Sequence, residues 1–124
     1  MKKSTLSLAL VLCLTAAFAQ TDKYIKTMEG AIQELYNAQA PDAFDPVINK
    51  LTRIGQAEKS QWEPFYYASL GHVFKSFRIQ DNQVKDGILD QAHSALDQAE
   101  TNSPENVEII ALRGFIDMMK MTIY

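Results

Sequence analysis

The stretch SQWEPFYYASLGHVFKSF, residues 60–77, decides the fold class of this chain. Ser60 and Glu63 have the spacing of a capping box, in which each side chain can satisfy the other residue's free backbone N–H. Pro64 then stands in the first turn, where a missing N–H costs nothing. The apolar residues that share one wide face after it are Phe65, Tyr66, Tyr67, Leu70, Val73, Phe74 and Phe77. This stretch therefore predicts an amphipathic helix.

Four further segments show the helical period, whereas the alternating β-branched runs typical of strands do not occur. The first runs from about residue 22 to 38, the fourth from about 85 to 100, and the fifth begins at Pro104. The second is expected to begin at Asp45-Pro46, or alternatively at Pro41-Asp42. Helices joined by short polar breaks become antiparallel neighbours. The predicted fold class is therefore all-α, an antiparallel helix-turn-helix array of about five helices.

The chain of 124 residues is long enough for one domain, and its start matches a secretory signal peptide. Two lysines follow the first methionine, and residues 6–18 form a mostly apolar run without charge. Ala17-Phe18-Ala19 supplies the small-x-small site that a signal peptidase needs. The run is shorter than the ~20 apolar residues that span a bilayer, which argues against the alternative of an uncleaved anchor. We expect export, to the periplasm or the medium.

Cys13 is the only cysteine, and it lies inside the expected signal peptide of residues 1–19. A lipid-anchored chain that begins at Cys13 is the rival interpretation, but Leu12 stands where a small residue usually precedes such a cysteine. The expected mature domain, residues 20–124, then has no cysteine, so disulfides and thiolate metal sites are excluded from it. No membrane span is expected after cleavage.

The charge of the mature chain excludes one class of partner. Subtracting Lys2 and Lys3 from the 12 basic residues leaves 10 against 15 acidic ones, a net charge of about −5. No basic patch interleaved with aromatic residues occurs. Nucleic acid is therefore not an expected partner, because binding it depends on contacts to phosphates. The same argument excludes an anionic membrane surface.

Two motifs carry a resemblance to a known family. YxxLGxxF at residues 67–74 matches the first helix of a tetratricopeptide repeat, and AxxxLxxA at residues 92–99, followed by Pro104, matches the second helix and its closing proline. The WEPFYY stretch is similar to a Trp-x-Pro-x-Tyr-Tyr signature of exported bacterial members. Over roughly residues 44–119 the chain resembles the exported bacterial tetratricopeptide (TPR)-like repeat proteins. The resemblance implies a TPR-like α-solenoid fragment, with Gly71 where the third and fourth helices come closest.

The chain also departs from the repeat pattern. Gly71 and Gly114 are 114 − 71 = 43 residues apart, where a standard repeat has 34. The nine extra residues are expected between the two helices, around residues 78–86. We therefore interpret the domain as a divergent array of two and a half units, whose fifth helix has no partner after it. Either Tyr124 is the end of the protein and this helix caps the array, or the chain is a piece of a longer one.

No constellation typical of an enzyme or a metal site occurs. His72 and His93 are the only histidines, and neither has the spacing of a metal ligand pair. There is no nucleophile elbow and no glycine-rich phosphate loop. Carboxylates such as Glu58, Glu63 and Asp90 are typical of solvated helix faces rather than of acid–base pairs. We therefore expect no catalytic, cofactor-binding or metal-binding residues.

The aromatic group around residue 65 has two interpretations, as core or as binding anchors. Trp62, Tyr67 and Phe74 are predicted to fill the core. In the family that the chain resembles, another stripe of the first helix lines a concave binding surface. The partner-binding residues that this resemblance implies are Phe65, Ala68, His72, Lys75, Glu108, Phe115 and Met119.

The predicted function is a non-catalytic helical repeat scaffold that binds a protein or peptide outside the cytoplasm. The alternative is a structural or assembly subunit that self-associates through its last helix, for example as a homodimer. Residues such as Val107, Phe115 and Met118 spread apolar character over more than one face of that helix. Repeat arrays normally finish with a polar face, and an uncovered apolar patch usually marks an interface. An enzyme is the third hypothesis, which no residue pattern favours.

We expect the exported protein to begin at Gln20, because the peptidase site ends at Ala19. Intact-mass measurement of the protein recovered from the cell envelope checks this prediction. A mass that includes Met1, or a lipid attached to Cys13, would contradict it.

Overall fold

The computed structural model describes residues 21–123, and within them it contains helices and connecting loops but no strand. Its five helices are residues 21–37, α2 (Pro41–Ala57), α3 (Glu63–Ser76), α4 (Asn82–Asn102) and α5 (Val107–Ile123). The predicted all-α class is confirmed. The expected signal peptide, Cys13 and Tyr124 lie outside the described residues. The chain divides into two compact units, Met1–Gly30 and Ala31–Tyr124, and the packing described below is that of the second unit.

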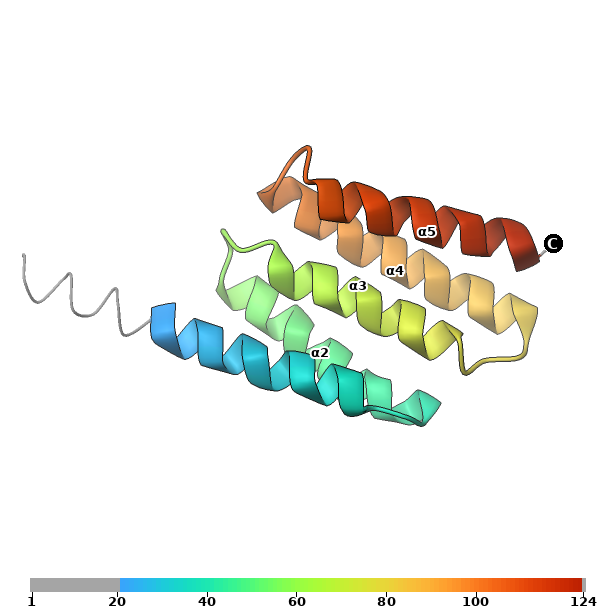
Figure 1. Cartoon of the computed structure of the whole chain (residues 1–124), viewed down its shortest axis with the longest axis horizontal. Coiled ribbons are helices and arrows are strands. Elements are labelled where there is room, and N and C mark those ends of the chain that lie inside the picture. The colour runs from blue at the N-terminus through green and yellow to red at the C-terminus, as the bar shows by residue number, and fades with distance from the viewer. Residues whose placement is uncertain (1–20, 124) are drawn as a thin grey trace, which may run out of the picture. The chain divides into compact units, whose positions relative to one another are not determined.

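Consecutive helices of the second unit pack against one another and run antiparallel (Figure 1). α3 packs on α2 and on α4, and α5 packs on α4. In Figure 1, α3 and α5 lie in front and α2 and α4 lie behind them. α3 and α5 point the same way, and both rest on α4. The antiparallel order that the short polar breaks predict is therefore found here.

The main core cluster lies between α3, α4 and α5. Its buried members are Phe65, Val73, Leu89, Ala92, Leu96, Ala99, Ile109, Leu112 and Ile116. One buried polar group enters this packing, because the hydroxyl of Ser69 donates a hydrogen bond of 2.8 Å to the carbonyl of Ala92. A buried hydroxyl needs such a partner, and this bond ties α3 directly to α4. The apolar stripe predicted for α2 is buried as well, at Phe44, Val47, Ile48 and Leu51.

Glycines set the contact between α2 and α3. A Cβ at position 71 would lie only 2.7 Å from Cγ1 of Ile48, and a Cβ at position 55 only 2.7 Å from Cζ of Phe65. Gly71 is therefore a point of close approach, as predicted, but its neighbours are Ile48 of α2 and Leu35 of the preceding helix rather than residues of α4. The reason is rotation: Ser69 and Val73 occupy the side of α3 that faces α4, which turns Gly71 toward α2. Gly55 lies inside α2, which ends at Ala57.

The starts of α2 and α3 differ from the preferred predictions. α2 begins at Pro41, the alternative start, so Pro46 stands inside the helix. The prediction that Ser60 caps α3 is wrong, because Trp62 occupies the cap position and makes no side-chain cap hydrogen bond. The loop before α3 is held by a different bond, in which the Asn102 side-chain amide donates to the carbonyl of Gln61 at 2.9 Å. Ser60 is thereby left outside the helix.

The starts of α4 and α5 are set by local caps that shift both boundaries. Asp81 caps α4 by accepting a hydrogen bond of 2.9 Å from the N–H of Val84, so the helix begins at Asn82 rather than near residue 85. α5 begins at Val107 rather than Pro104, because Glu105 has a left-handed φ of 60° that interrupts the helix. The following Asn106 side chain accepts from the N–H groups of Glu108 and Ile109. Both caps satisfy backbone donors that a helix start leaves free.

None of the helices within residues 21–123 combines the length and the apolar character needed to cross a membrane.

Replacement of Gly71 by leucine should lower the melting temperature, because the new side chain overlaps Ile48. Overpacking of this kind costs about 1–3 kcal/mol, and each kcal/mol shifts the melting temperature of such a domain by roughly 4–8 °C. Gly87→Leu is the matched control, since nothing lies within 4 Å of a Cβ at position 87. Thermal circular dichroism measures both variants. Equal melting temperatures would show that α2 does not rest on Gly71.

Candidate aromatic binding surface

Two sides of α3 are covered by other helices, and its third side carries half-exposed aromatic rings. Ser69 and Val73 face α4, and Gly71 faces α2. The remaining side holds Tyr66, Tyr67, Leu70, Phe74 and Phe77 at steps of three and four residues. Together with Tyr36 and Phe115 from neighbouring helices, the aromatic members of this side form what we call the aromatic surface: Tyr36, Tyr66, Tyr67, Phe74, Phe77 and Phe115.

Ring contacts link four members of the aromatic surface across three helices, and a separate contact joins the other two. Phe74 lies 5.8 Å from Tyr36, and Phe77 lies 6.3 Å from Phe115 between ring centroids. Within α3, Tyr66 and Tyr67 meet edge to face at 5.2 Å. These distances and tilts are the ones that aromatic pairs prefer. The rings are therefore already ordered, although Tyr36 is 57% exposed and Phe77 is 50% exposed.

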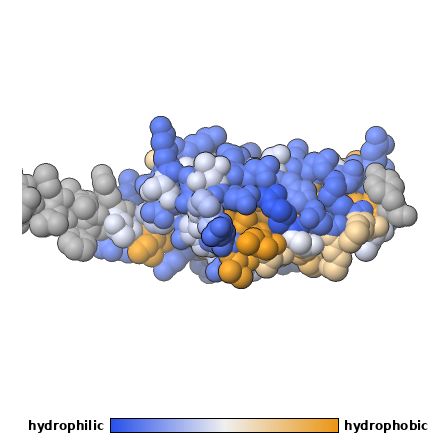
Figure 2. Space-filling view, turned by 90° about the horizontal axis from the view of Figure 1, so that it is seen from above, coloured by the Kyte–Doolittle hydropathy of each residue, from blue (hydrophilic) through white to orange (hydrophobic). Residues whose placement is uncertain are grey.

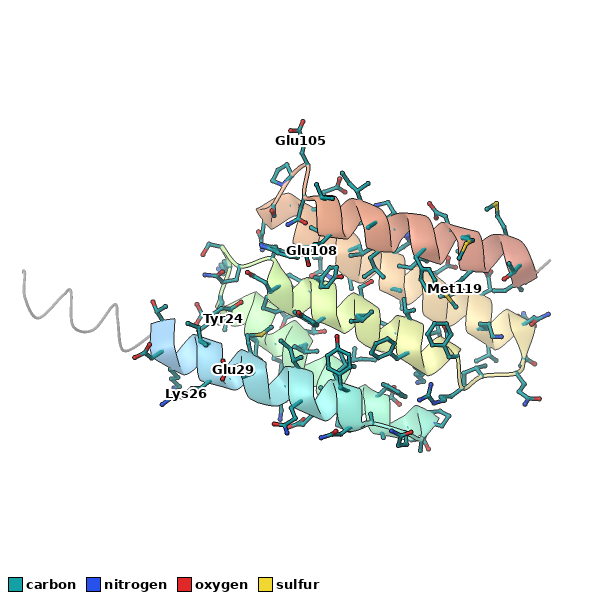
Figure 3. The ribbon with its side chains drawn as sticks, viewed as in Figure 1. Tyr24, Lys26, Glu29, Glu105, Glu108 and Met119 are labelled. Carbon is teal, nitrogen blue, oxygen red and sulfur yellow. The ribbon has the colours of Figure 1, made fainter. Side chains whose placement is uncertain are left out.

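The groups whose charge raises the tyrosine pKa values at this surface are carboxylates and phenols. Burial raises the pKa of the Tyr66 phenol, and the nearby carboxylate of Glu108 raises it further. Burial also raises the pKa of Tyr67, with added contributions from Tyr36, Glu108 and Glu63. Both phenols therefore keep their protons at neutral pH. Figure 3 shows Glu108 on the side of α5 that lies next to α3, whereas Glu105 points away from the loop.

Three of the residues that the family resemblance implied for partner binding lie at or beside this surface. Phe115 is 39% exposed and belongs to it, and Glu108 is exposed at its edge. Met119 is half-buried and packs against the core cluster with its side chain toward α3 (Figure 3). The structure thus brings these α5 residues together with the aromatic side of α3.

The other four implied residues do not form a binding surface, which corrects that expectation. Phe65 and Ala68 are buried, with 6% and 1% of their surface exposed. Lys75 is half-buried and pairs with Asp45 of α2 at 2.7 Å. His72 is also half-buried, and no group in the described part of the chain bonds to its Nδ1. The small residues of this stripe allow α2 to pack against it, so the stripe lies in the interior.

The sequence pattern missed most of the aromatic surface. Tyr67 and Phe74 were predicted as core but are half-exposed, and Tyr36 and Phe77 were not singled out for binding. One signal was available: the apolar residues of α3 extend over most of its circumference. Two neighbouring helices cannot cover so wide an apolar face. The helical period alone does not show which part of the face remains exposed to solvent.

The charged groups of α4 and α5 are engaged with each other. Arg113 pairs with Asp97 and Glu100, each at 3.0 Å. Lys120 pairs with Asp86 and Asp90, and these hydrogen bonds raise the pKa of Lys120. His93 Nε2 lies 2.8 Å from Asp117. Within residues 21–123, no group of three or more histidine, cysteine, aspartate or glutamate side chains is placed to hold a metal ion.

Stability should fall as the pH drops from about 6.5 toward 4, because of His72. Burial, helped by Lys75 and opposed by Asp45, lowers the pKa of His72 from 6.5 to about 4. In this window the unfolded chain binds a proton that the folded chain excludes, so up to about 3 kcal/mol of stability is lost.

Urea unfolding of the wild type and of His72→Leu, compared at pH 7 and pH 5, measures this loss. The variant should lack part of the decrease, whereas the control His93→Gln should keep it. Parallel pH profiles for wild type and His72→Leu would contradict the assignment.

Comparison of the chain with protein-family models, with curated proteins and with solved structures gives no match. What bears on its function is therefore the chemistry of the aromatic surface itself, ordered rings and phenols beside a carboxylate.

Proposed function

We propose that this protein is a non-catalytic helical scaffold that binds a segment of another protein on its aromatic surface. The observation that carries the proposal is the set of ordered but half-exposed rings that three helices contribute to one side. The N-terminal signal pattern supports a location outside the cytoplasm. The resemblance to exported TPR-like proteins supports the same role.

The energetics favour a bound partner. Full burial of a large apolar side chain stabilises by roughly 1.5–3 kcal/mol, so covering a half-exposed ring contributes about half of that. Tyr36, Phe77 and Phe115 each still expose between 39% and 57% of their surface. Rings already held by their neighbours lose little conformational freedom on binding, and rigid aromatic anchors of this kind dominate many interfaces.

The electrostatics indicate what the partner carries. Glu108 and Glu63 both act on the phenols of the aromatic surface, and each raises a tyrosine pKa there. Such an environment favours a cation, and a lysine or arginine can also lie over an aromatic ring. The whole chain has a formal net charge of −3, which attracts basic segments. We therefore propose a segment that combines apolar residues with lysine or arginine.

Binding explains this surface better than catalysis does. Its own residues are rings, phenols with raised pKa values and one adjacent carboxylate. They include no nucleophile held against a base, which the usual covalent mechanisms require. The phenols and the carboxylate are suited instead to hydrogen bonds and ion pairs with a partner.

Selection from a displayed random peptide library on the purified protein tests the proposal. Enriched peptides should combine apolar and basic residues, and their binding should change the fluorescence of Trp62, the only tryptophan. Trp62 reports on the surface because its ring meets Tyr66 at 5.5 Å.

Two pairs of variants then locate the site. Glu108→Gln should weaken binding of an enriched peptide by roughly 2–5-fold, the usual effect of an exposed ion pair, while Glu105→Gln should not. Phe77→Ser should weaken it about tenfold, as expected of an interface anchor, while Val84→Ser on α4 should not. Phe77 and Val84 are 50% and 51% exposed, so the two substitutions are matched. Equal binding by all four variants would exclude the aromatic surface as the site.

A further inference from the structure

A second, separate face of α5 is apolar and exposed. Its residues point away from α4 and carry no charge: Val107, Ile110, Ala111, Gly114, Met118, Met121 and Thr122, which we call the α5 outer face. Val107 is 77% exposed, Met121 is 74% and Ile110 is 58%. Figure 2 looks onto the α5 side of the molecule and shows a band of hydrophobic surface there. The two cations of α5, Arg113 and Lys120, pair with carboxylates of α4.

The contact between α2 and α3 shows what such a face accepts. Residues 68–73 of α3 and residues 111–116 of α5 correspond at an offset of 43 positions. Val73 and its counterpart Ile116 both pack into the core that α4 shares. Ala68 and Gly71 have the counterparts Ala111 and Gly114.

In α3 this alanine–glycine pair is covered by another helix. Ala68 is 1% exposed, and Ile48 of α2 rests on Gly71. In α5 both counterparts are exposed, and nothing lies within 4 Å of a Cβ at position 114. The alanine–glycine pair is therefore a contact site for another helix that is covered in α3 and uncovered in α5. We call this pair the helix-binding seat.

We propose that a second copy of this chain occupies the seat, with the two α5 helices packed antiparallel about a two-fold axis near Gly114. In this register the apolar residues of one copy meet apolar residues of the other around the small Gly114. Met118 lies over Ile110 and Ala111 of the second copy, and Met121 lies beside Val107 of the second copy. A helix face that is self-complementary in this way suits an isologous dimer.

The charges at the edges fit the same arrangement. Arg113 and Asp117 stand one turn apart along one edge of α5, and each also pairs with α4 of its own copy. An antiparallel two-fold pair brings the Asp117 of one copy toward the Arg113 of the other, so opposite charges meet. An anionic membrane surface is a poorer occupant of this face. Helices that bind such a surface carry lysine and arginine beside their apolar face, whereas the edges here carry the carboxylates of Glu108 and Asp117.

A specific but reversible dimer buries about 1,200 Å² in total, or about 600 Å² from each copy. The side chains that supply this area are Val107, Ile110, Met118 and Met121, which are 77%, 58%, 49% and 74% exposed. This proposal is independent of binding at the aromatic surface, although Phe115 borders both faces.

Sedimentation velocity of the purified chain over a series of micromolar concentrations tests the dimer. Gly114→Glu should raise the dimer dissociation constant by roughly 30-fold or more, as expected at the centre of an interface. Gly87→Glu is the matched control, because position 87 is also an exposed helical glycine with nothing within 4 Å of a Cβ. Circular dichroism should show both variants folded, since each replaces an unobstructed glycine in a helix.

Cysteine variants in a Cys13→Ser background test the orientation. Gly114→Cys should form a disulfide between copies under mild oxidation, because the axis passes close to it. Val107→Cys should not link to itself in an antiparallel pair, but it should link to a Met121→Cys chain. Self-linking of Val107→Cys would overturn the antiparallel arrangement.

A wild type that stays monomeric throughout, or a dimer that Gly114→Glu leaves intact, would overturn the proposal. So would capture of a different protein on the α5 outer face of a monomeric chain. The Trp62 fluorescence response to library peptides should survive Gly114→Glu. Failure of the dimer and failure of the aromatic surface are therefore separate results.

Discussion

The packing of Ile48 on Gly71 is the contact on which the rest of this structure depends. It allows α2 to approach α3 closely, and it fixes how α3 is rotated about its own axis. That rotation sends Ser69 and Val73 toward α4 and leaves the aromatic side uncovered. A larger residue at position 71 would force α2 outward or turn α3. The glycine therefore determines which residues are core and which face solvent.

The sequence predicted the fold class well because helical periodicity is a property of each segment alone. The stripe from Phe44 to Leu51 in α2 is an example, since its members are buried as expected. The candidate site could be predicted only in part. Periodicity shows that Phe65 and Ala68 share a stripe with His72, but it does not show which neighbour covers that stripe. The assignment to a concave surface failed there because α2 closes over it. Glu108 and Phe115 are exposed because no described helix covers that edge of α5, and their role in binding stays a prediction.

The helix ends show a similar division between local and tertiary causes. Asp81 and Asn106 are good capping residues, and each makes the backbone contacts that its side chain favours. Both caps could be predicted from the sequence if the polar runs around Asp81 and Asn106 are taken as helix starts rather than as loops. The start of α3 could not, because a bond from Asn102, which is 41 residues away, holds the preceding carbonyl of Gln61. Local patterns do not encode a contact of that range.

The hydrogen bond from Ser69 to the carbonyl of Ala92 has a consequence for how α3 and α4 can slide. An interface made only of alanine, leucine and valine can shift along the helix axes at little cost, because one aliphatic neighbour replaces another. The hydroxyl has one acceptor, and sliding by a turn would leave it buried without a partner, at about 1–3 kcal/mol. The Ser69 side chain alone therefore opposes sliding of α3 along α4. It selects one axial register for a helix–helix interface that is otherwise apolar.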